Sequence, residues 1–253
     1  MKNMLLKNQM ENQGIRLFRF RGTLPLIVLG FGLYEYLQTE LHPELYPLEG
    51  TPYEVYFEMF CLAVAFLGLI VRIITVGHTP ANTSGRNVEE QVADQLNTTG
   101  MYSIVRNPLY LGNFMIWLMI SMLTMNIWFI VAFVFLYWLY YERIIFAEEQ
   151  YLARKFGKEY EDWAAKTPCF IPRFSGYKKA GYSFSWKKAV KKEKNGLLAL
   201  LLVFSLFDII GELTVRESPK YMTIAAVTAV VTVAYFIIKY IKRNTALLEE
   251  PGR

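Results

Sequence analysis

The chain has few of the residues from which metal sites and disulfide frameworks are built. Its 253 residues include two cysteines and two histidines, and only 19% of them are charged. Cys61 and Cys169 lie far apart and match neither a disulfide pattern nor a metal-ligand spacing, so no metal site is expected. A glycine-rich strand-to-helix turn is also missing, because Gly30 and Gly32 lie inside an apolar stretch. These absences exclude a soluble dinucleotide-binding fold.

Apolar residues take the place of what is missing and make up 54% of the chain. A helix needs roughly 20 apolar residues to cross the hydrocarbon core of a bilayer. About six stretches approach this length: Leu24–Leu37, Tyr56–Val76, the two halves of Leu109–Tyr141, Gly196–Val215 and Tyr221–Ile238. Met125 and Asn126 are predicted to form the turn of a helical hairpin. We therefore expect an all-α integral membrane protein with about six transmembrane helices.

Basic residues are distributed unevenly between the predicted loops. The loop 39–55 has no lysine or arginine, whereas 13 of the 27 basic residues lie between Arg143 and Lys194. Such asymmetry predicts that both termini and the longer loops face the cytoplasm. The expected location is a bacterial inner membrane. The basic run 187–194 suits anionic lipid headgroups, and no nucleic-acid partner is expected.

Four regions follow from this pattern. Residues 1–55 are predicted to form an amphipathic arm and the first span, and residues 56–173 the core with its cofactor site. Residues 174–195 are predicted to be a basic surface linker, and residues 196–253 a C-terminal helical pair. The oligomeric state and the role of this last pair stay open.

A polar turn precedes the hairpin, and paired carboxylates follow it. Pro108 favours the first turn of a helix, which places Arg106 beside the positive end of the helix dipole, where anions bind. Glu148 and Glu149 come about two turns after the apolar run and point about 100° apart. Each has an ordinary interpretation: a lipid anchor for Arg106, and an exposed helix face for the glutamates. The helix is expected to break near Gly157.

Together these residues resemble the signature of the isoprenylcysteine carboxyl methyltransferase and phospholipid methyltransferase superfamily of integral membrane enzymes. The family pattern is Arg-His-Pro-x-Tyr-x-Gly, a hydrophobic hairpin, Glu-Glu, Phe-Gly-x-x-Tyr and Pro-x-x-Ile-Pro. The matching segments here are 106–112 (Arg-Asn-Pro-Leu-Tyr-Leu-Gly), 148–149, 156–160 and 168–172. Order, spacing and hydrophobic setting agree over roughly residues 56–174.

The resemblance implies S-adenosylmethionine as methyl donor and a membrane lipid as acceptor. Arg106 and Glu149 are the expected catalytic residues, with Arg106 also holding the acceptor and Glu148 or Glu149 holding the cationic donor. The expected cofactor-binding set is Gly100, Tyr102, Asn107, Pro108, Tyr110, Gly112, Glu148 and Glu149.

One departure from the family pattern bears on the acceptor. Asn107 stands where the family has histidine, and an asparagine cannot take up a proton. An amine acceptor must lose a proton, whereas a phosphate or carboxylate oxygen need not, so we expect an anionic acceptor. The loop 77–87 resembles that of bacterial members that methylate a lipid A phosphate, with His78 and Arg86 suited to a phosphate. Whether Asn107 alters or removes activity stays open.

The first prediction is therefore methylation of an anionic lipid headgroup, with phosphate before carboxylate. Within the class, the alternatives are a prenylcysteine carboxylate and a phospholipid amine. A related membrane sterol reductase would need nicotinamide-binding motifs that the chain lacks. A non-enzymatic lipid-binding or transport protein is the remaining alternative, with Glu58, Asp208 and Glu212 lining a path through the membrane.

Overall fold

The structure is a computed structural model that describes residues 5–80, 83, 93–215 and 222–252. Within these residues it is all-helical and has no strand. The eight α-helices are α1 (Leu6–Arg19), α2 (Leu24–Leu41), α3 (Glu54–Gly77), α4 (Pro108–Leu123), α5 (Ile127–Phe156), α6 (Lys158–Ala164), α7 (Trp186–Val215) and α8 (Met222–Asn244). Single 3₁₀ turns cover Pro43–Leu45, Gly100–Ser103 and Phe174–Gly176.

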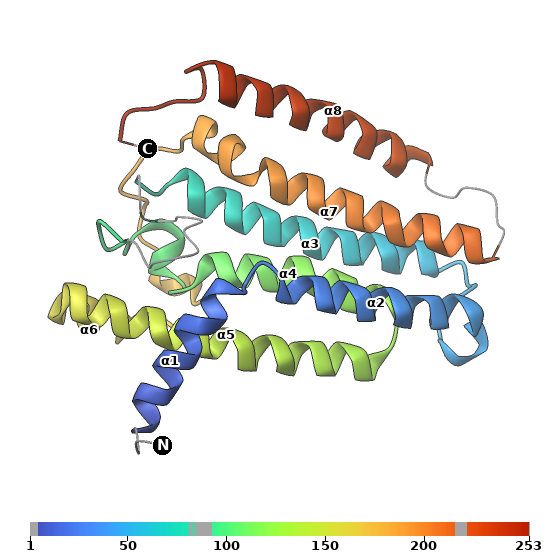
Figure 1. Cartoon of the computed structure of the whole chain (residues 1–253), viewed down its shortest axis with the longest axis horizontal. Coiled ribbons are helices and arrows are strands. Elements are labelled where there is room, and N and C mark those ends of the chain that lie inside the picture. Colours follow the sequence, from blue (N-terminus) through green and yellow to red (C-terminus); the bar gives the residue numbers. More distant parts are fainter. Residues whose placement is uncertain (1–4, 81–82, 84–92, 216–221, 253) are drawn as a thin grey trace.

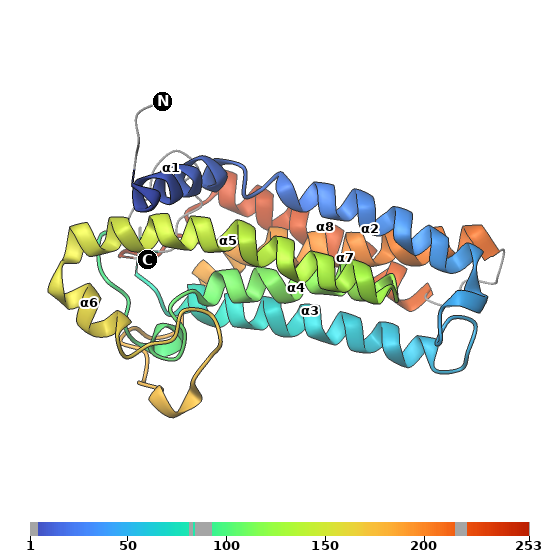
Figure 2. The same cartoon turned by 90° about the horizontal axis from the view of Figure 1, so that it is seen from below.

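Six of the helices run side by side along the long axis of the molecule, and α1 and α6 lie across one end (Figures 1 and 2). That end also holds the last turn of α3, the first turns of α4 and α7, and the last turn of α8. We call it the cavity end, and the opposite end, where α2 leads into α3, the distal end. The segments with most charged and polar residues thus meet at one end of an apolar bundle.

Four of the described helices are long and apolar enough to cross a membrane: α3, α5, α7 and α8. These helices confirm the expectation of a membrane protein. The expected six spans are matched only in part. Helix α4 has 16 residues, and the second half of α2 carries Glu35 and Glu40. Both helices nevertheless pack alongside the longer ones within the bundle.

The predicted hairpin is confirmed. Helix α4 ends at Leu123, and Asn126 caps α5 by accepting hydrogen bonds from the backbone N–H groups of Trp128 and Phe129 at 3.0 and 3.2 Å. The predicted break is confirmed as well, because α5 ends at Phe156 and Gly157 adopts a φ of +54°. A left-handed residue without a side chain lets the chain turn into α6.

Helices α3 and α4 have the most extensive contact of any two helices in the described chain. Gly68 and Gly112 allow this contact. A Cβ atom at Gly112 would lie 2.6 Å from Cγ of Arg72 and 2.7 Å from the carbonyl oxygen of Gly68. Gly112 was predicted to contact the cofactor, but its position explains helix packing and the placement of the Arg72 side chain.

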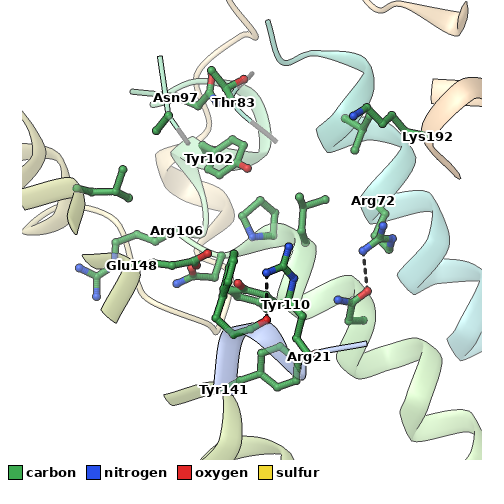
Figure 3. A pocket seen from close by; sticks show the side chains of 18 of the residues that line it. Arg21, Arg72, Thr83, Asn97, Tyr102, Arg106, Tyr110, Tyr141, Glu148 and Lys192 are labelled. Atoms are coloured by element: carbon green, nitrogen blue, oxygen red, sulfur yellow. Dashed lines mark hydrogen bonds between the residues drawn. The ribbon is translucent and has the colours of Figure 1, made fainter. Parts of the chain in front are cut away.

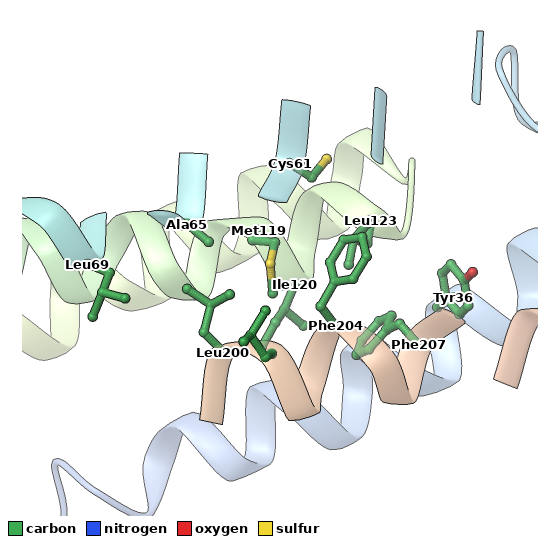
Figure 4. Packing of buried hydrophobic residues seen from close by; sticks show 11 residues of the cluster. Tyr36, Cys61, Ala65, Leu69, Met119, Ile120, Leu123, Leu200, Phe204 and Phe207 are labelled. Atoms are coloured by element: carbon green, nitrogen blue, oxygen red, sulfur yellow. The ribbon is translucent and has the colours of Figure 1, made fainter. Parts of the chain in front are cut away.

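The main apolar core lies between α2, α3, α4 and α7 (Figure 4). Its fully buried members include Cys61, Met119 and Phe207. A second cluster, built around Phe133, Tyr137 and Tyr141, joins α5 to α1 and α4. Because α7 contributes to the main core, it is not a separate C-terminal attachment.

Residues 174–195 were predicted to be a basic surface linker, but the last ten of these residues belong to a helix. Helix α7 begins at Trp186, and both Lys188 and Glu193 on it are buried. The Lys188 ammonium donates to the carbonyl oxygens of Thr79 and Pro80 at 2.7 and 2.8 Å. The carbonyl groups that follow α3 need donors, and a lysine from α7 supplies them.

Candidate active site

A cavity of about 460 Å³ opens at the cavity end of the bundle. Its walls come from α3, α4, α5, the start of α7, the junction of α1 and α2, and residues 93–97 and 102. Figure 3 shows two groups of charged side chains on different sides of this space, with aromatic rings between them. Arg106 and Glu148 form one group, and Arg72 and Lys192 belong to the other.

Arg106 is fixed by the chain that returns after α6. Its backbone N–H donates to the carbonyl oxygen of Pro168 at 2.9 Å, and its guanidinium lies 3.3 Å from the Glu149 carboxylate. The Nε atom of Arg106 is buried and has no hydrogen-bond partner in the described part of the protein. A buried donor without a partner is costly, so this atom is a candidate contact for a ligand.

The two adjacent glutamates do different things. Glu148 lines the cavity and lies within hydrogen-bonding reach of the Tyr110 hydroxyl. Glu149 does not line it and serves as the ion-pair partner of Arg106. The sequence left open which carboxylate would face a donor, and the helical rotation between them places Glu148 in the cavity.

Several aromatic side chains line the cavity, among them Tyr102, Tyr110, Tyr141 and Trp163. Tyr110 packs against Tyr141 with ring centroids 4.9 Å apart, and Trp163 Nε1 donates to the backbone oxygen of Tyr102 at 3.1 Å. Burial, together with the negative charge of Glu148, raises the pKa of the Tyr102 hydroxyl above its ordinary value. Tyr102 therefore remains a neutral hydrogen-bond donor at physiological pH.

Asn107 and Pro108 shape the start of α4. Pro108 occupies the first turn of α4, as predicted, and Asn107 precedes it. The Asn107 side-chain amide donates to the Cys169 carbonyl oxygen at 3.0 Å and lies 3.5 Å from Cys169 Sγ. Both residues line the cavity, and Asn107 also ties the segment after α6 to the beginning of α4.

Three predicted site residues lie elsewhere or cannot be placed. Gly100 adopts a φ of +60° and donates to the Lys178 carbonyl oxygen, outside the cavity lining. The ring nitrogen Nδ1 of His78 lies 2.9 Å from the Ile74 carbonyl oxygen, and its ring packs on Phe184. The described contacts thus give His78 the role of an ordinary loop histidine. Arg86 lies outside the described residues.

The opposite side of the cavity was not predicted from the sequence. Arg72 donates from Nε and Nη2 to the two carboxylate oxygens of Glu193, each at 2.8 Å, and from Nη1 to Asn113 at 2.6 Å. Lys192 lies next to this group in the cavity wall. An arginine inside an otherwise apolar helix was the available signal for this cluster.

The N-terminal arm also contributes, which the sequence did not predict. Phe18, Arg21 and Gly22 line the cavity where α1 leads into α2. The Arg21 guanidinium lies 3.6 Å above the Phe18 ring. Helix α1 is anchored to α5, since the Tyr140 hydroxyl donates to the Leu17 carbonyl oxygen at 2.7 Å.

Comparisons with known proteins identify the central part of the chain that forms this cavity. A model of the phospholipid methyltransferase family matches residues 59–159. These residues are thus similar to the phospholipid methyltransferase family, and we call residues 59–159 the family domain. It includes Arg72, Arg106, Tyr110 and Glu148, but not the cavity residues from α1 and α7.

Several curated proteins are each similar to part of the chain. A probable protein-S-isoprenylcysteine O-methyltransferase from Oryza sativa subsp. indica is 29% identical over 153 residues, which are 58% of this chain and 75% of that protein. Protein-S-isoprenylcysteine O-methyltransferase B from Arabidopsis thaliana is 33% identical over 117 residues, 45% of this chain and 58% of that protein.

A third relative has a different kind of name. The nickel-cobalt-cadmium resistance protein NccN from Alcaligenes xylosoxydans xylosoxydans is 36% identical over 116 residues, 45% of this chain and 51% of that protein. The chain thus spans about half of NccN and somewhat more of the Arabidopsis protein. No solved structure is significantly similar to the chain. None of these three relatives is named for lipid A, so the lipid A branch of the sequence analysis stays a prediction.

Proposed function

We propose that this protein transfers a methyl group from S-adenosylmethionine to the carboxylate of a lipid-linked acceptor, with a prenylated cysteine as the acceptor class. One observation carries the proposal. Arg106, Glu148 and Tyr102 of the family motif region line a single cavity at the end of an apolar bundle. The cavity volume of about 460 Å³ is within the range that small-molecule sites occupy.

The residues on the Arg106 side of the cavity suit the charges of the donor. S-adenosylmethionine has a carboxylate, an ammonium and a sulfonium that carries the transferable methyl group. The unpartnered Nε of Arg106 is suited to the carboxylate, and Glu148 to the neighbouring positive charges. This assignment moves Arg106 from the acceptor, where the sequence analysis placed it, to the donor. Tyr102 and Tyr110 offer aromatic surface for the adenosine.

For methyl transfer the protein has to position the donor and the acceptor and to exclude water. One carboxylate oxygen of the acceptor forms a bond to the methyl carbon while the bond between carbon and sulfur breaks, which leaves an ester and a neutral thioether. The negative and the positive charge disappear together, so a dry cavity favours the step. No proton has to move, and Asn107 in place of the family histidine is no obstacle.

The comparisons favour a carboxylate over the phosphate that the sequence analysis ranked first. The Oryza and Arabidopsis relatives are named as isoprenylcysteine O-methyltransferases. The cavity also continues past Asn113 to Trp117, roughly 15 Å along α4 from Asn107 at 1.5 Å per residue. A prenyl chain could follow this apolar side of the cavity. The basic residues at the cavity end support a cytoplasmic position for it.

The test uses purified protein in detergent, labelled S-adenosylmethionine and two acceptors. These are N-acetyl-S-farnesylcysteine and vesicles of dioleoyl phosphatidic acid. Label that enters the farnesylcysteine and is released by mild alkali supports the proposal, because methyl esters are alkali-labile. Label on the phosphatidic acid would instead support the phosphate interpretation. If folded protein neither binds S-adenosylhomocysteine by calorimetry nor labels any acceptor, the methyltransferase proposal is wrong.

A further inference from the structure

We propose that Lys192 and Arg72, which Glu193 and Asn113 hold in place, form the subsite for the anionic group of the acceptor, so that α7 contributes to acceptor selection from outside the family domain. The proposal rests on the proposed methyltransferase function and adds where the acceptor binds. We call these four residues the α7 wall.

The guanidinium of Arg72 is preorganised to bind an anion. Its contacts with Glu193 and Asn113 use three of its five N–H groups, as far as the described residues show. The two that are left belong to the terminal nitrogens, Nη1 and Nη2. A guanidinium fixed on three sides loses little conformational freedom when an anion binds to the remaining nitrogens. Arg72 also lines the cavity itself.

Burying the charges of this cluster costs free energy, so helix packing alone does not explain its presence. The side chains of Arg72 and Glu193 are only 15% and 4% exposed, and Arg72 sits within an apolar helix. Removing both charges from water costs energy that the ion pair only partly returns. Ionisable residues within a membrane-spanning helix are therefore functional candidates.

Position separates the α7 wall from the donor side. Figure 3 shows Arg72 and Lys192 on the side of the cavity away from Arg106 and Glu148, with Tyr102 between them. Asn113 lies on α4 about 1.7 turns beyond Asn107, and Trp117 follows about one turn later. An acceptor with its chain beside Trp117 would bring its charged head to Arg72 before reaching the donor. One carboxylate oxygen can then bind Arg72 and Lys192 while the other faces the methyl group.

Part of the specificity would then come from a helix that the family domain does not include. Lys192 and Glu193 are outside residues 59–159, whereas Arg72, Asn113 and the donor-side residues are inside. Buried Lys188 joins the start of α7 to the residues that follow α3. This contact fixes where Lys192 and Glu193 lie along the bundle. This division lets one donor site serve different acceptors when the helix beyond the domain changes.

The experiment measures charge selectivity by calorimetry with S-adenosylhomocysteine bound. N-acetyl-S-farnesylcysteine is compared with its carboxamide, which has the same shape and no charge. The unmodified protein should bind the carboxylate about tenfold more tightly or better, as expected for a charge-assisted contact. Lys192→Glu and Arg72→Gln should bring this ratio close to one and leave the affinity for S-adenosylhomocysteine unchanged. Lys187→Glu, on an exposed position of the same helix, is the matched control and should keep the full ratio.

The outcomes separate this inference from the proposed function. If the unmodified protein transfers methyl groups but both variants keep the carboxylate preference, the α7 wall is not the acceptor subsite. Loss of S-adenosylhomocysteine binding in folded Lys192→Glu protein would place the wall at the donor and overturn the inference as well. Arg72 packs against Gly112, so Lys192→Glu decides the matter if Arg72→Gln fails to fold. When phosphatidic acid is the acceptor instead, the same variants should weaken its methylation relative to Lys187→Glu.

Discussion

The buried polar groups pair with one another at the distal end of the bundle, whereas at the cavity end they surround a cavity. At the distal end, the Thr39 hydroxyl donates to the Thr124 carbonyl oxygen at 2.6 Å, and the Asn126 amide donates to Glu35 at 2.9 Å. These groups satisfy one another across α2 and the α4–α5 turn. At the cavity end, arginines and glutamates from several helices surround open space.

This difference shows which buried charges are structural. A polar pair that closes on itself fixes the position of two helices and leaves nothing for a ligand. Arg106 differs, because it lines the cavity and its buried Nε has no partner in the described part of the protein. Glu58, Asp208 and Glu212, which a transport function would use, do not line the described cavity.

The strongest test of the contrast is Arg106→Gln at the cavity end. The variant removes the positive charge and the pair with Glu149, and we expect methyl transfer to fall about 100-fold or more, as when a preorganised charge contact is lost. Binding of S-adenosylhomocysteine should weaken with it, because the donor carboxylate loses its partner.

Lysine at the same position is the matched control. Arg106→Lys keeps the charge without the planar guanidinium and should fall between the two proteins. Thermal unfolding in detergent shows whether both variants are folded. Turnover close to normal in folded Arg106→Gln protein would contradict the role of Arg106.

A second test concerns the contact that places Arg72. In Gly112→Val the new side chain would meet Arg72 and the backbone of Gly68, so α3 and α4 must separate. We expect a loss of roughly 1–3 kcal/mol in stability from overpacking. Acceptor binding should weaken more than donor binding, since Arg72 moves. Gly30→Val, where a Cβ meets nothing within 4 Å, is the control and should do neither.

What the sequence predicted and what it missed follow from the range of the interactions. Pro108 at the start of α4, the turn before Asn126 and the break at Gly157 depend on local backbone preferences, and all three were predicted correctly. The pairing of Arg72 with Glu193 joins residues 121 positions apart. No local pattern encodes such a pair.

The second glutamate illustrates an intermediate case. Helical geometry predicted that Glu148 and Glu149 diverge, but not which of them faces the cavity. That choice depends on where α1 and the segment after α6 pack. Likewise, the basic composition of residues 187–194 predicted a surface linker. It gave no sign that these residues begin α7, on which Lys188 and Glu193 are buried.

A third test addresses the distal end and should leave function unchanged. Thr39→Val keeps the shape of a fully buried side chain but removes the hydrogen bond to Thr124. The free energy of unfolding should fall by about 1–2 kcal/mol, because a buried carbonyl loses its donor. The kinetic constants for donor and acceptor should equal those of the unmodified protein. Thr39→Ser, which retains the hydroxyl, separates loss of the hydrogen bond from loss of a methyl group.

The smallest expected effect concerns the two cysteines, because one lies in the closed core and the other lies at the cavity end. Cys61 is fully buried in the core between the helices, whereas Cys169 is partly exposed beside Glu149 and Asn107. Burial, and then the negative charge of Glu149, raises the pKa of the Cys169 thiol above its ordinary value. The thiol therefore stays protonated to higher pH, and its alkylation at pH 8 should be slow.

Glu149→Gln removes the negative charge, lowers the pKa of the Cys169 thiol and should speed its alkylation by iodoacetamide roughly 2- to 5-fold. Mass spectrometry follows the modified peptide, with Cys169→Ser as the control for site and Cys61 expected to remain unmodified throughout. An unchanged rate in folded Glu149→Gln protein would mean that Glu149 faces away from Cys169, and its pairing with Arg106 would need to be reconsidered.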